Sequence, residues 1–367
     1  MKIKMILTNA FSPDVRVYKE AKYLVSQGHE VEVLCWDKTP EKGLPRVEKQ
    51  DGIRIRRFGI SAIEGTGYKQ IVAYLSFIHQ CRKYLKRRKC DVLHCHDLDG
   101  AIVGYLARKR FVFDMHEFYD KGGKVRKKLS HIIGCFLAKR SVGNIYVSSL
   151  NLEAYGKGIE DRFFPLRNYC DSSMFRGCNK IPSDVLRIAY IGRVRNQIKE
   201  FAALFKAVKD LERVRVDIYG DGPDLEQLRV MAEKNENVTI HGAFNGLEDS
   251  VDIFRNTDVS YVAYDPTNPN YQGEFEPVKL FEAMFTGTPI IATQSLNPGR
   301  FAVDKGVGLA VDTRSDEELK EAICYLRDNP KAMKGFESRM KEISKEYDWN
   351  NVVQILDKVY ETVKNTR

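Results

Sequence analysis

At 367 residues, the chain exceeds one domain of ordinary size and is long enough for two. Hydrophobic residues at 43% and charged residues at 30% are typical of a globular protein and exclude the disordered and fibrous classes. No apolar run reaches the roughly 18 residues of a membrane-spanning helix, and the N-terminus lacks the apolar region and cleavage site of a signal peptide. We therefore expect a cytoplasmic protein, and a peripheral position at the inner face of the cell membrane fits this expectation.

Charge is divided unevenly between the two halves of the chain. Residues 1–170 contain 32 lysines and arginines against 18 acids, a net charge of +14. Residues 171–367 contain 27 basic and 32 acidic residues, a net charge of −5. This asymmetry indicates that the first half meets an anionic substrate or surface. The eight cysteines are scattered without a metal-binding spacing, so we expect reduced thiols.

Short apolar segments alternate with amphipathic segments along the first half. The expected strands are Ile3–Thr8, Val31–Trp36, Ile53–Phe58, Val92–Cys95, Phe111–Met115 and Asn144–Ser148. The amphipathic segments between them that we expect to be helical are Val15–Gln27, Tyr68–Lys89 and Gly100–Arg108. Almost wholly apolar strands that alternate with helices are typical of a parallel sheet covered on both faces.

The second half repeats this alternation. Its expected strands are Leu186–Ile191, Val214–Tyr219, Val238–His241, Val259–Tyr264 and Pro289–Ala292. Its expected helices lie near Lys199–Asp210, Asp224–Lys234, Pro277–Phe285 and Glu317–Arg327. The sequence therefore predicts an α/β protein of two Rossmann-like, doubly wound domains, residues 1–170 and 171–347. Such domains bind ligands at the carboxyl ends of their strands, in a cleft between the two sheets. A last helical segment, residues 348–367, is able to cross back to the first domain.

A pair of glutamates marks the start of the helix near residue 277. Glu274 precedes this helix, and Glu282 follows eight positions later, about one and a half turns deeper. Pro277 suits the first turn of a helix, whose free N–H groups and dipole attract phosphate. One carboxylate is then placed to face a sugar and the other to accept hydrogen bonds from ribose hydroxyls. By spacing alone, two solvated acids explain the pair equally well.

With the Lys-Leu-Phe-Glu-Ala-Met stretch and the trailing Gly-Thr-Pro, this pair resembles the Glu-x7-Glu motif of family 4 of the retaining glycosyltransferases. The resemblance covers nearly the whole chain and implies the GT-B fold, with two Rossmann-like domains. It implies that Glu274 contacts the transferred sugar and that Glu282 binds the nucleotide ribose. The remaining residues expected to bind the donor around this helix start are Phe275, Glu276, Val278 and Lys279. Glu276 stands where many family members have glycine.

A glycine turn followed by two cations ends the first strand of the second half. Gly192 and Arg193 follow that strand, and Lys199 comes six residues after the arginine. Arginine supplies a bidentate fork and lysine a mobile charge, a pair suited to a diphosphate. In the family, this pair neutralises the leaving nucleoside diphosphate in place of a metal ion. The resemblance therefore implies a nucleotide diphosphate sugar as donor, no metal and no other cofactor. Asp97-Leu98-Asp99 has the spacing of a metal motif, but we expect no metal there.

Histidines and acids follow two buried strands of the first half. His94 and His96 alternate on one strand and so point to the same face, with His96 nearest the carboxyl end. A histidine at a strand end is more often structural than catalytic. The stretch Asp-Val-Leu-His-Cys-His nevertheless resembles the family motif whose second histidine contacts the sugar, which implies catalysis by His96 and a mainly structural His94. Asp97, His116 and Glu117 are expected on the acceptor side.

The resulting prediction is a retaining, metal-independent glycosyltransferase. It would move a sugar from a UDP- or GDP-sugar to a glycan, a lipid-linked molecule or a small molecule, as in the synthesis of cell envelope glycans. The expected catalytic residues are His96, Arg193, Lys199 and Glu274. Basic clusters in the first half, above all residues 121–128 before an apolar helical stripe, suit an anionic membrane surface. A solvated helix face explains those clusters equally well.

Two other functions are compatible with parts of the sequence. A nucleotide-sugar 2-epimerase shares the double fold, but the Glu-x7-Glu spacing and the His-x-His loop fit it less well. A nucleic-acid-binding protein would suit the net charge of +9. It leaves the motifs of the acidic second half unexplained, and we expect no nucleic acid as partner.

Overall fold

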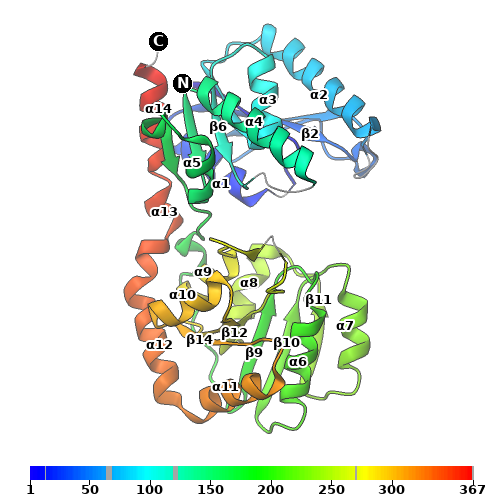
Figure 1. Cartoon of the computed structure of the whole chain (residues 1–367), viewed down its shortest axis with the longest axis vertical. Helices are drawn as coiled ribbons and strands as arrows, with labels where there is room; N and C mark the ends of the chain where they lie inside the picture. The colour runs from blue at the N-terminus through cyan, green and yellow to red at the C-terminus, as the bar shows by residue number, and fades with distance from the viewer. Residues whose placement is uncertain (13, 63–67, 119–122, 269–270, 366–367) are drawn as a thin grey trace. The chain divides into compact units, whose positions relative to one another are not determined.

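The computed structural model describes the chain except for residues 13, 63–67, 119–122, 269–270 and 366–367. The chain folds into two compact units (Figure 1). Unit 1 comprises Met1–Asn168 and Val352–Arg367, and unit 2 comprises Tyr169–Asn351. The last segment of the chain therefore belongs to the unit that contains the first segment.

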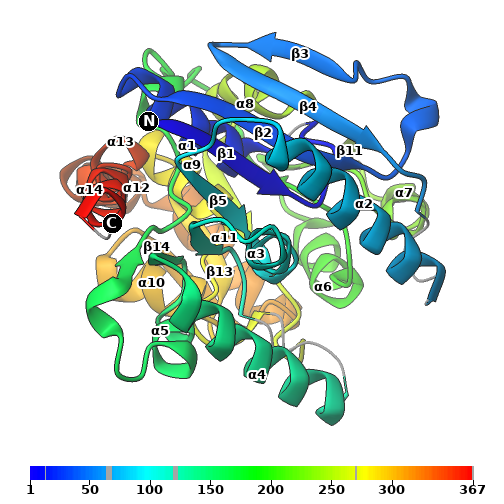
Figure 2. The same ribbon diagram turned by 90° about the horizontal axis from the view of Figure 1, so that it is seen from above.

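Unit 1 is built on a sheet of eight strands in the order β3-β4-β2-β1-β5-β6-β7-β8. The strands are β1 (Lys2–Leu7), β2 (Glu30–Asp37), β3 (Val47–Gln50), β4 (Ile53–Gly59), β5 (Val92–His96), β6 (Phe111–Met115), β7 (Gly143–Tyr146) and β8 (Phe163–Pro165). Figure 2 shows β3, β4, β2, β1 and β5 side by side in this order. The strands pair in parallel except for β3, which pairs with β4 in the antiparallel direction, so the predicted parallel sheet gains one antiparallel edge strand. Asp51 and Gly52, with φ of 49° and 82°, form the tight reversal between these two strands.

Helices cover both faces of this sheet. They are α1 (Val15–Ser26), α2 (Tyr68–Lys86), α3 (Asp97–Leu106), α4 (Lys124–Arg140), α5 (Ser149–Tyr155) and α14 (Ile355–Asn365). On one face, α2, α3 and α4 pack on an apolar core that includes Phe77, Phe113 and Leu137. On the other face, α1 and α14 contact polar side chains of β5 and β6, among them His94 and Asp114. Because side chains alternate along a strand, the same two strands serve an apolar core and a polar cluster.

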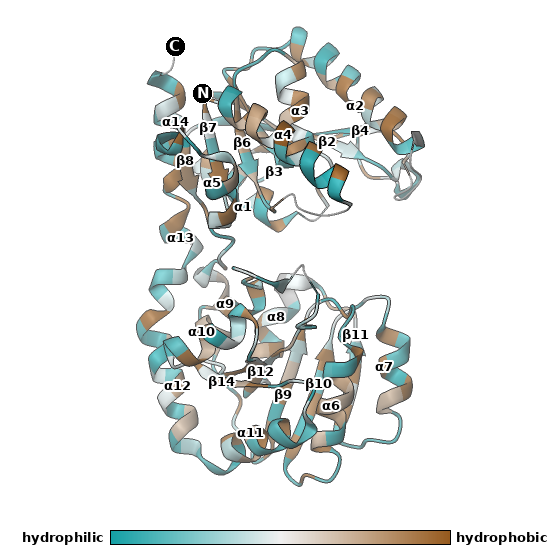
Figure 3. Cartoon of the chain, in the orientation of Figure 1, coloured by the Kyte–Doolittle hydropathy of each residue, from teal (hydrophilic) through white to brown (hydrophobic). Residues whose placement is uncertain are grey.

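Unit 2 has a wholly parallel sheet of six strands in the order β11-β10-β9-β12-β13-β14. The strands are β9 (Leu186–Ile191), β10 (Val214–Tyr219), β11 (Val238–Gly242), β12 (Val259–Val262), β13 (Ile290–Thr293) and β14 (Gly308–Val311). The helices are α6 (Ile198–Val208), α7 (Leu225–Ala232), α8 (Gly246–Arg255), α9 (Val278–Phe285), α10 (Asn297–Lys305), α11 (Asp316–Asp328) and α12 (Pro330–Ile343). Apolar cores fill both faces, one around Phe201 and Tyr261 and the other around Phe254 and Phe281. Figure 3 shows brown residues along β9 and β10 and teal residues on the outer helices.

The expected elements are recovered with small shifts at their ends. The helix expected from Pro277 begins at Val278, with Pro277 as its extended cap residue. The expected final helix is divided into α13 (Trp349–Val352) and α14. In the described part of the chain, no helix combines the length and apolar character needed to cross a membrane.

Candidate active site

Strand β5 carries two histidines on the face that α1 and α14 cover. The rings of His94 and His96 stack with their centroids 4.7 Å apart, which confirms that both point to the same face. Both side chains are fully buried. Nδ1 of His94 lies 2.8 Å from the hydroxyl oxygen of Tyr360 in α14. The last helix of the chain therefore contacts His94, the histidine that stacks on the predicted catalytic residue His96.

Asp114 on β6 lies at the centre of this cluster. Its Oδ2 atom is 3.0 Å from Nδ1 of His96 and 2.9 Å from Nε2 of His116. Its Oδ1 atom accepts a hydrogen bond of 3.0 Å from Nη2 of Arg16. Arg16 in turn pairs with Glu20, one turn further along α1, at 3.0 Å. Because an ionised carboxylate only accepts hydrogen bonds, both histidine nitrogens are placed to donate to Asp114.

Burial and charge set different protonation states within the cluster. Burial lowers the pKa of His96, and the opposing effect of Asp114 does not overcome it. Burial acts in the same direction on His116, but the Asp114 carboxylate outweighs it and raises the pKa of His116 to about 9. Burial alone would raise the pKa of Asp114, yet Arg16 and His116 hold it well below its usual value. Neutral His96 then donates from Nδ1, and its Nε2 has no hydrogen-bond partner among the described residues.

The turn that follows His96 is strained. Asp97 has φ of 59°, a left-handed conformation that few residues other than glycine adopt. Its Oδ1 atom accepts a hydrogen bond of 3.2 Å from the backbone N–H of His116, and its Oδ2 atom lies 3.7 Å from Nδ1 of that histidine. The structure thus brings the predicted residues His96, Asp97 and His116 together. Glu117 is exposed, and its carbonyl accepts a hydrogen bond of 3.1 Å from Nδ2 of Asn151.

The same cluster contains the residues best suited to hold a cation in the described part of unit 1. Glu20, His94, His96 and Asp114 each offer one ligand atom, and these atoms lie within 4.8 Å of one another. The guanidinium group of Arg16 already contacts both carboxylates. Its positive charge therefore lies directly beside the acidic members of this cluster.

In unit 2, two glycines bring the ends of β9 and β10 into close contact. Gly192 and Gly220 have φ of 142° and 155°. A Cβ atom at Gly220 would lie 1.7 Å from the carbonyl oxygen of Gly192, so only glycine fits there. The residue between the end of β9 and Arg193, Gly192, therefore has no side chain, and its backbone is open to a ligand.

Lys279, in the first turn of α9, is a buried amine. Its side chain is 7% exposed, and its Nζ atom has no hydrogen-bond partner among the described residues. Nζ lies 3.6 Å from the ring centroid of Tyr190 and 5.2 Å from that of Tyr264. A Cβ atom at Gly192 would lie 2.9 Å from Nζ, which places the amine against the glycine turn. Burial lowers the pKa of Lys279 to about 7, with Glu282 acting in the opposite direction. A buried, unpartnered amine of this kind is prepared to receive an anion.

The segment before α9 positions the predicted donor residues. Glu274, Phe275 and Glu276 are half-buried, and Val278 and Lys279 form the first turn of the helix. Phe275 anchors the segment, because its ring packs 4.9 Å from that of Tyr264 and 4.9 Å from that of Tyr271. The first N–H groups of a helix have no acceptor within the helix. This segment therefore offers N–H groups, one amine and carboxylates close together.

Arg193 and Lys199 are both exposed, Arg193 just after β9 and Lys199 as the second residue of α6. Glu200, the residue after Lys199, is buried at 1% exposure. It accepts a hydrogen bond of 2.6 Å from Nε of Arg314, whose Nη2 atom donates to Oδ1 of Asp265 at 2.5 Å. This ion-pair network fixes the start of the helix that carries Lys199.

Two known families match the chain, one over most of unit 1 and one over most of unit 2. Residues 13–149 match the family described as "Glycosyl transferase 4-like domain", and residues 186–329 match the family described as "Glycosyl transferases group 1". The chain is a GT-B glycosyltransferase of the family 4-like type. The chain is also 25% identical over 366 residues to phosphatidyl-myo-inositol mannosyltransferase of Mycolicibacterium smegmatis, an alignment that covers 95% of this glycosyltransferase and 89% of the relative.

Solved structures share the fold of this glycosyltransferase. Sucrose-phosphate synthase from Thermosynechococcus elongatus superposes with a TM-score of 0.77 and 15% identity, over 100% of each chain. The Anabaena protein HepE in complex with UDP and glucose superposes with a TM-score of 0.70 and 15% identity, over 99% of this chain and 100% of HepE. At these identities, the likeness establishes the fold. The family matches give no support to the epimerase or to the nucleic-acid-binding alternative.

Several residues of the glycosyltransferase's unit 1 cluster had no role in the sequence-based prediction. Arg16 and Asp114 lie in the segments Asp14-Val15-Arg16-Val17 and Asp114-Met115-His116-Glu117, and the charged side chains in these segments were the signal that could have found them. Glu20 and Tyr360 lie outside any motif, and Tyr360 is separated from His94 by 266 positions. Only the folded structure reveals these two contacts.

Proposed function

We propose that this chain is a retaining glycosyltransferase that uses a UDP- or GDP-sugar without a metal ion. The observation that carries this proposal is the buried amine of Lys279 beside the Gly192 turn, at the start of α9. Among the described residues, no carboxylate accepts a hydrogen bond from Nζ of Lys279, and this unpartnered amine favours the binding of an anion. A diphosphate supplies that anion and would raise the pKa of Lys279 as it binds.

The donor roles follow from the groups around this turn. Arg193 and Lys199 would contact the diphosphate and stabilise the charge that develops on it as the sugar leaves. The first N–H groups of α9 would act on the same phosphates. Glu274 would accept hydrogen bonds from sugar hydroxyls, and Glu282 from the ribose. Positive charge already present in the protein then does what a metal ion does in other transferases.

In the proposed reaction, the bond between the anomeric carbon and the β-phosphate oxygen breaks while the acceptor oxygen bonds to the same face of that carbon. The acceptor's proton passes to the departing phosphate oxygen, so atoms and charges balance. His96 would contact the transferred sugar, with Asp114 fixing its tautomer. Asp97, His116 and Glu117 would position the acceptor hydroxyl.

The proposed acceptor is a lipid-linked molecule or glycan at a membrane. The relative in Mycolicibacterium smegmatis is named for transfer to a phosphatidyl-inositol. In α4, exposed apolar side chains alternate with basic ones: Val125 is 83% exposed and Leu129 55%, beside Arg126 and Lys128. A basic amphipathic helix suits an anionic leaflet. The eight free cysteines fit a reducing compartment, so we place the enzyme at the inner face of the cell membrane.

A thermal-shift panel of UDP, GDP and their common sugars tests the donor assignment. We expect one nucleotide family to raise the Tm by several degrees, through binding to the folded state. Turnover of that donor should persist in EDTA, and NMR of the product should show the anomeric configuration of the donor. No shift by any nucleotide, or turnover abolished by EDTA and restored by a divalent metal, would contradict the proposal.

Sedimentation with vesicles tests the membrane assignment separately. We expect binding to phosphatidylglycerol vesicles that weakens as salt rises, and little binding to phosphatidylcholine vesicles. Replacing Leu129 and Ile132, two exposed residues of α4, with serine should reduce this binding. Serine at buried positions of the same helix would disturb folding and would not test the membrane contact. Equal binding of the variant and the original chain would exclude α4 as the contact.

A further inference from the structure

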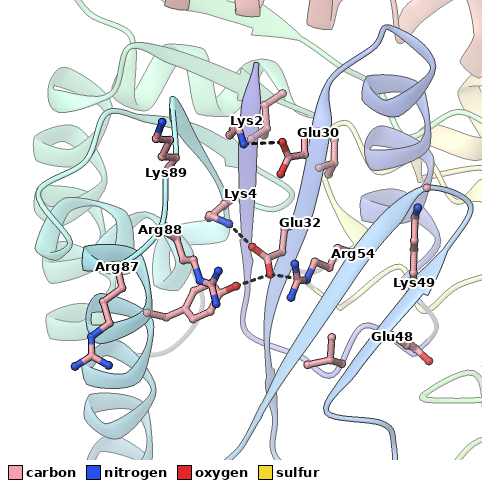
Figure 4. Close-up of a pocket in the computed structure, with 15 residues that line it drawn as sticks. Lys2, Lys4, Glu30, Glu32, Glu48, Lys49, Arg54, Arg87, Arg88 and Lys89 are labelled. Carbon is pink, nitrogen blue, oxygen red and sulfur yellow. Dashed lines mark hydrogen bonds and ion pairs between the residues drawn. The ribbon is translucent and has the colours of Figure 1, made fainter.

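A pocket of about 820 Å³ lies at the amino ends of the first strands of unit 1 (Figure 4). Its floor is formed by the beginnings of β1 and β2, including Lys2, Lys4, Glu30 and Glu32. His96 ends the neighbouring strand β5, whose five residues span about 13 Å. The pocket therefore lies at the edge of the sheet opposite to the predicted catalytic histidine, and its volume is in the range of small-molecule sites.

The pocket is strongly basic. Seven lysines and arginines line it against three glutamates. Figure 4 shows the basic residues on both sides: Arg87, Arg88 and Lys89 at the end of α2, and Arg54 and Lys49 on the strands opposite. Charges of one sign that gather in a hollow raise the local concentration of the opposite ion.

The three glutamates are already engaged. Glu32, buried in the floor, pairs with Lys4 and accepts a hydrogen bond of 2.7 Å from the hydroxyl of Tyr84. Burial opposes ionisation of Glu32, but these contacts lower its pKa and keep it charged. Glu30 lies 3.0 Å from Lys2, and Glu48 lies 2.6 Å from Arg57, which does not line the pocket.

The remaining cations stand close together. Among the described residues, no ion pair within 4.0 Å is found for Lys49, Arg87, Arg88 or Lys89. Arg88 lies 5.6 Å from the ring centroid of Tyr84. The same ring has Lys4 at 5.4 Å and Arg56 at 4.6 Å, so three cations surround one aromatic ring. Like charges at such separations repel one another, and an anion in the pocket would relieve this repulsion.

We propose that this pocket binds a ligand with two or more neighbouring phosphate groups, at a site separate from the nucleotide sugar. Arginine forks and lysine amines match phosphate oxygens in charge and geometry. The phosphates belong either to a soluble oligophosphate or to adjacent headgroups on an anionic phospholipid surface, and both present the same chemistry to Arg87, Arg88 and Lys89. Tyr84 and the aliphatic stems of these side chains would cover the less polar part of the ligand.

Calorimetric titration with inorganic tripolyphosphate tests this site. The full chain carries Arg193→Ala, Lys199→Ala and Lys279→Met, so that binding at the proposed donor site does not contribute. We expect tripolyphosphate to bind in this background. Combining Arg87→Gln, Arg88→Gln and Lys89→Gln should raise the dissociation constant at least tenfold. The matched control is Arg82→Gln, Lys83→Gln and Lys86→Gln, which removes the same charge from exposed positions of α2 outside the pocket. The control should change the dissociation constant by less than threefold.

A second arm distinguishes the two sources of phosphate. Vesicles of phosphatidylglycerol are sedimented with the same chains, with and without tripolyphosphate as competitor. Vesicle binding that depends on Arg87, Arg88 and Lys89 and is displaced by tripolyphosphate supports a headgroup ligand. Tight tripolyphosphate binding with vesicle binding unaffected by the three substitutions supports a soluble ligand. Equal weakening by the pocket variant and the control, or no tripolyphosphate binding at all, overturns the proposal. Because the donor site is disabled throughout, these results do not depend on the proposed function.

Discussion

The Oδ2 atom of Asp114 lies 3.0 Å from Nδ1 of His96. This contact fixes the tautomer of the histidine, because the carboxylate accepts and the Nδ1–H donates. It leaves Nε2 as the unprotonated nitrogen of His96. The same carboxylate oxygen holds the Nε2 atom of His116 at 2.9 Å, so one charged group orients both histidines.

Asp114→Asn should therefore impair turnover more than donor binding. We expect kcat to fall by about 100-fold, the usual cost of misplacing a group that positions the reacting centre, while the KM for the donor changes little. The pKa of His116 should fall from about 9, because the carboxylate that raises it has lost its charge. NMR titration of the histidine measures this fall even where the variant is less stable. Asp161→Asn, at an exposed position of the same unit, is the control. An unchanged kcat with correct folding would exclude the orienting role.

Donor affinity should depend on pH through Lys279. Its pKa is lowered to about 7 by burial, so the amine is a cation below that pH and neutral above it. A diphosphate binds the cationic form, so the affinity for the nucleoside diphosphate should fall as the pH rises from about 7 to 9. Calorimetry in buffers of different ionisation enthalpy should detect proton uptake on binding. Lys279→Met should remove both effects, and an equal pH dependence in the variant would contradict the assignment.

The same substitution should stabilise the ligand-free protein. The folded-state pKa of Lys279 lies below that of the unfolded chain, so the unfolded chain binds more protons and stability falls as the pH drops from about 10 to 7. Methionine fills a similar volume and carries no charge to bury. We expect Lys279→Met to raise the Tm at pH 7 by about 2–4 °C, which corresponds to about 1 kcal/mol for a domain of this size. A lower Tm in the variant would show that the aromatic rings of Tyr190 and Tyr264 more than offset the burial.

The sequence predicted the elements whose residues are buried on both sides. Strand β9 (Leu186–Ile191) and β10 (Val214–Tyr219) have their expected bounds, because most residues in each strand are apolar. Strand β3 (Val47–Gln50) was missed, since it is a short edge strand with three polar residues and little buried surface. Strand β14 (Gly308–Val311) was missed because four residues carry too weak a pattern.

Some site residues could be predicted from nearby sequence, and others depend on contacts between distant parts of the chain. His96 ends β5, Asp97 follows it and His116 follows β6, and these two strands pair in parallel, so the proximity of the three residues can be predicted from topology alone. The burial of Lys279 could not be foreseen, because it depends on rings from β9 and from the segment after β12 that enclose the amine. The same holds for Tyr360, whose contact with His94 requires the chain end to return to unit 1.

The two exposed cations of unit 2 should act on the diphosphate together. Arg193→Ala with Lys199→Ala should weaken the affinity for the nucleoside diphosphate by at least about 100-fold, since each charge-assisted contact contributes about 1.5–3 kcal/mol. Both positions are exposed, so the Tm of the ligand-free chain should not change. Arg195→Ala with Lys206→Ala removes the same charge nearby and is the control. Nucleotide affinity and turnover that survive in the first variant would refute the proposed donor site.

The ion pair of Glu200 and Arg314 should stabilise unit 2 and position Lys199. Arg314→Leu leaves Glu200 charged and buried at 1% exposure, which should lower the free energy of unfolding by about 3–5 kcal/mol. Adding Glu200→Gln removes the unpaired charge and should restore most of that loss. Denaturant unfolding of the two single variants and the double variant gives the coupling energy between the two positions. If the double variant is as unstable as Arg314→Leu, the loss comes from the contact with Asp265 or from packing. The affinity for the donor is measured on the same variants. If the double variant regains stability but binds the donor more weakly than the original chain, the network also orients the start of α6, which carries Lys199.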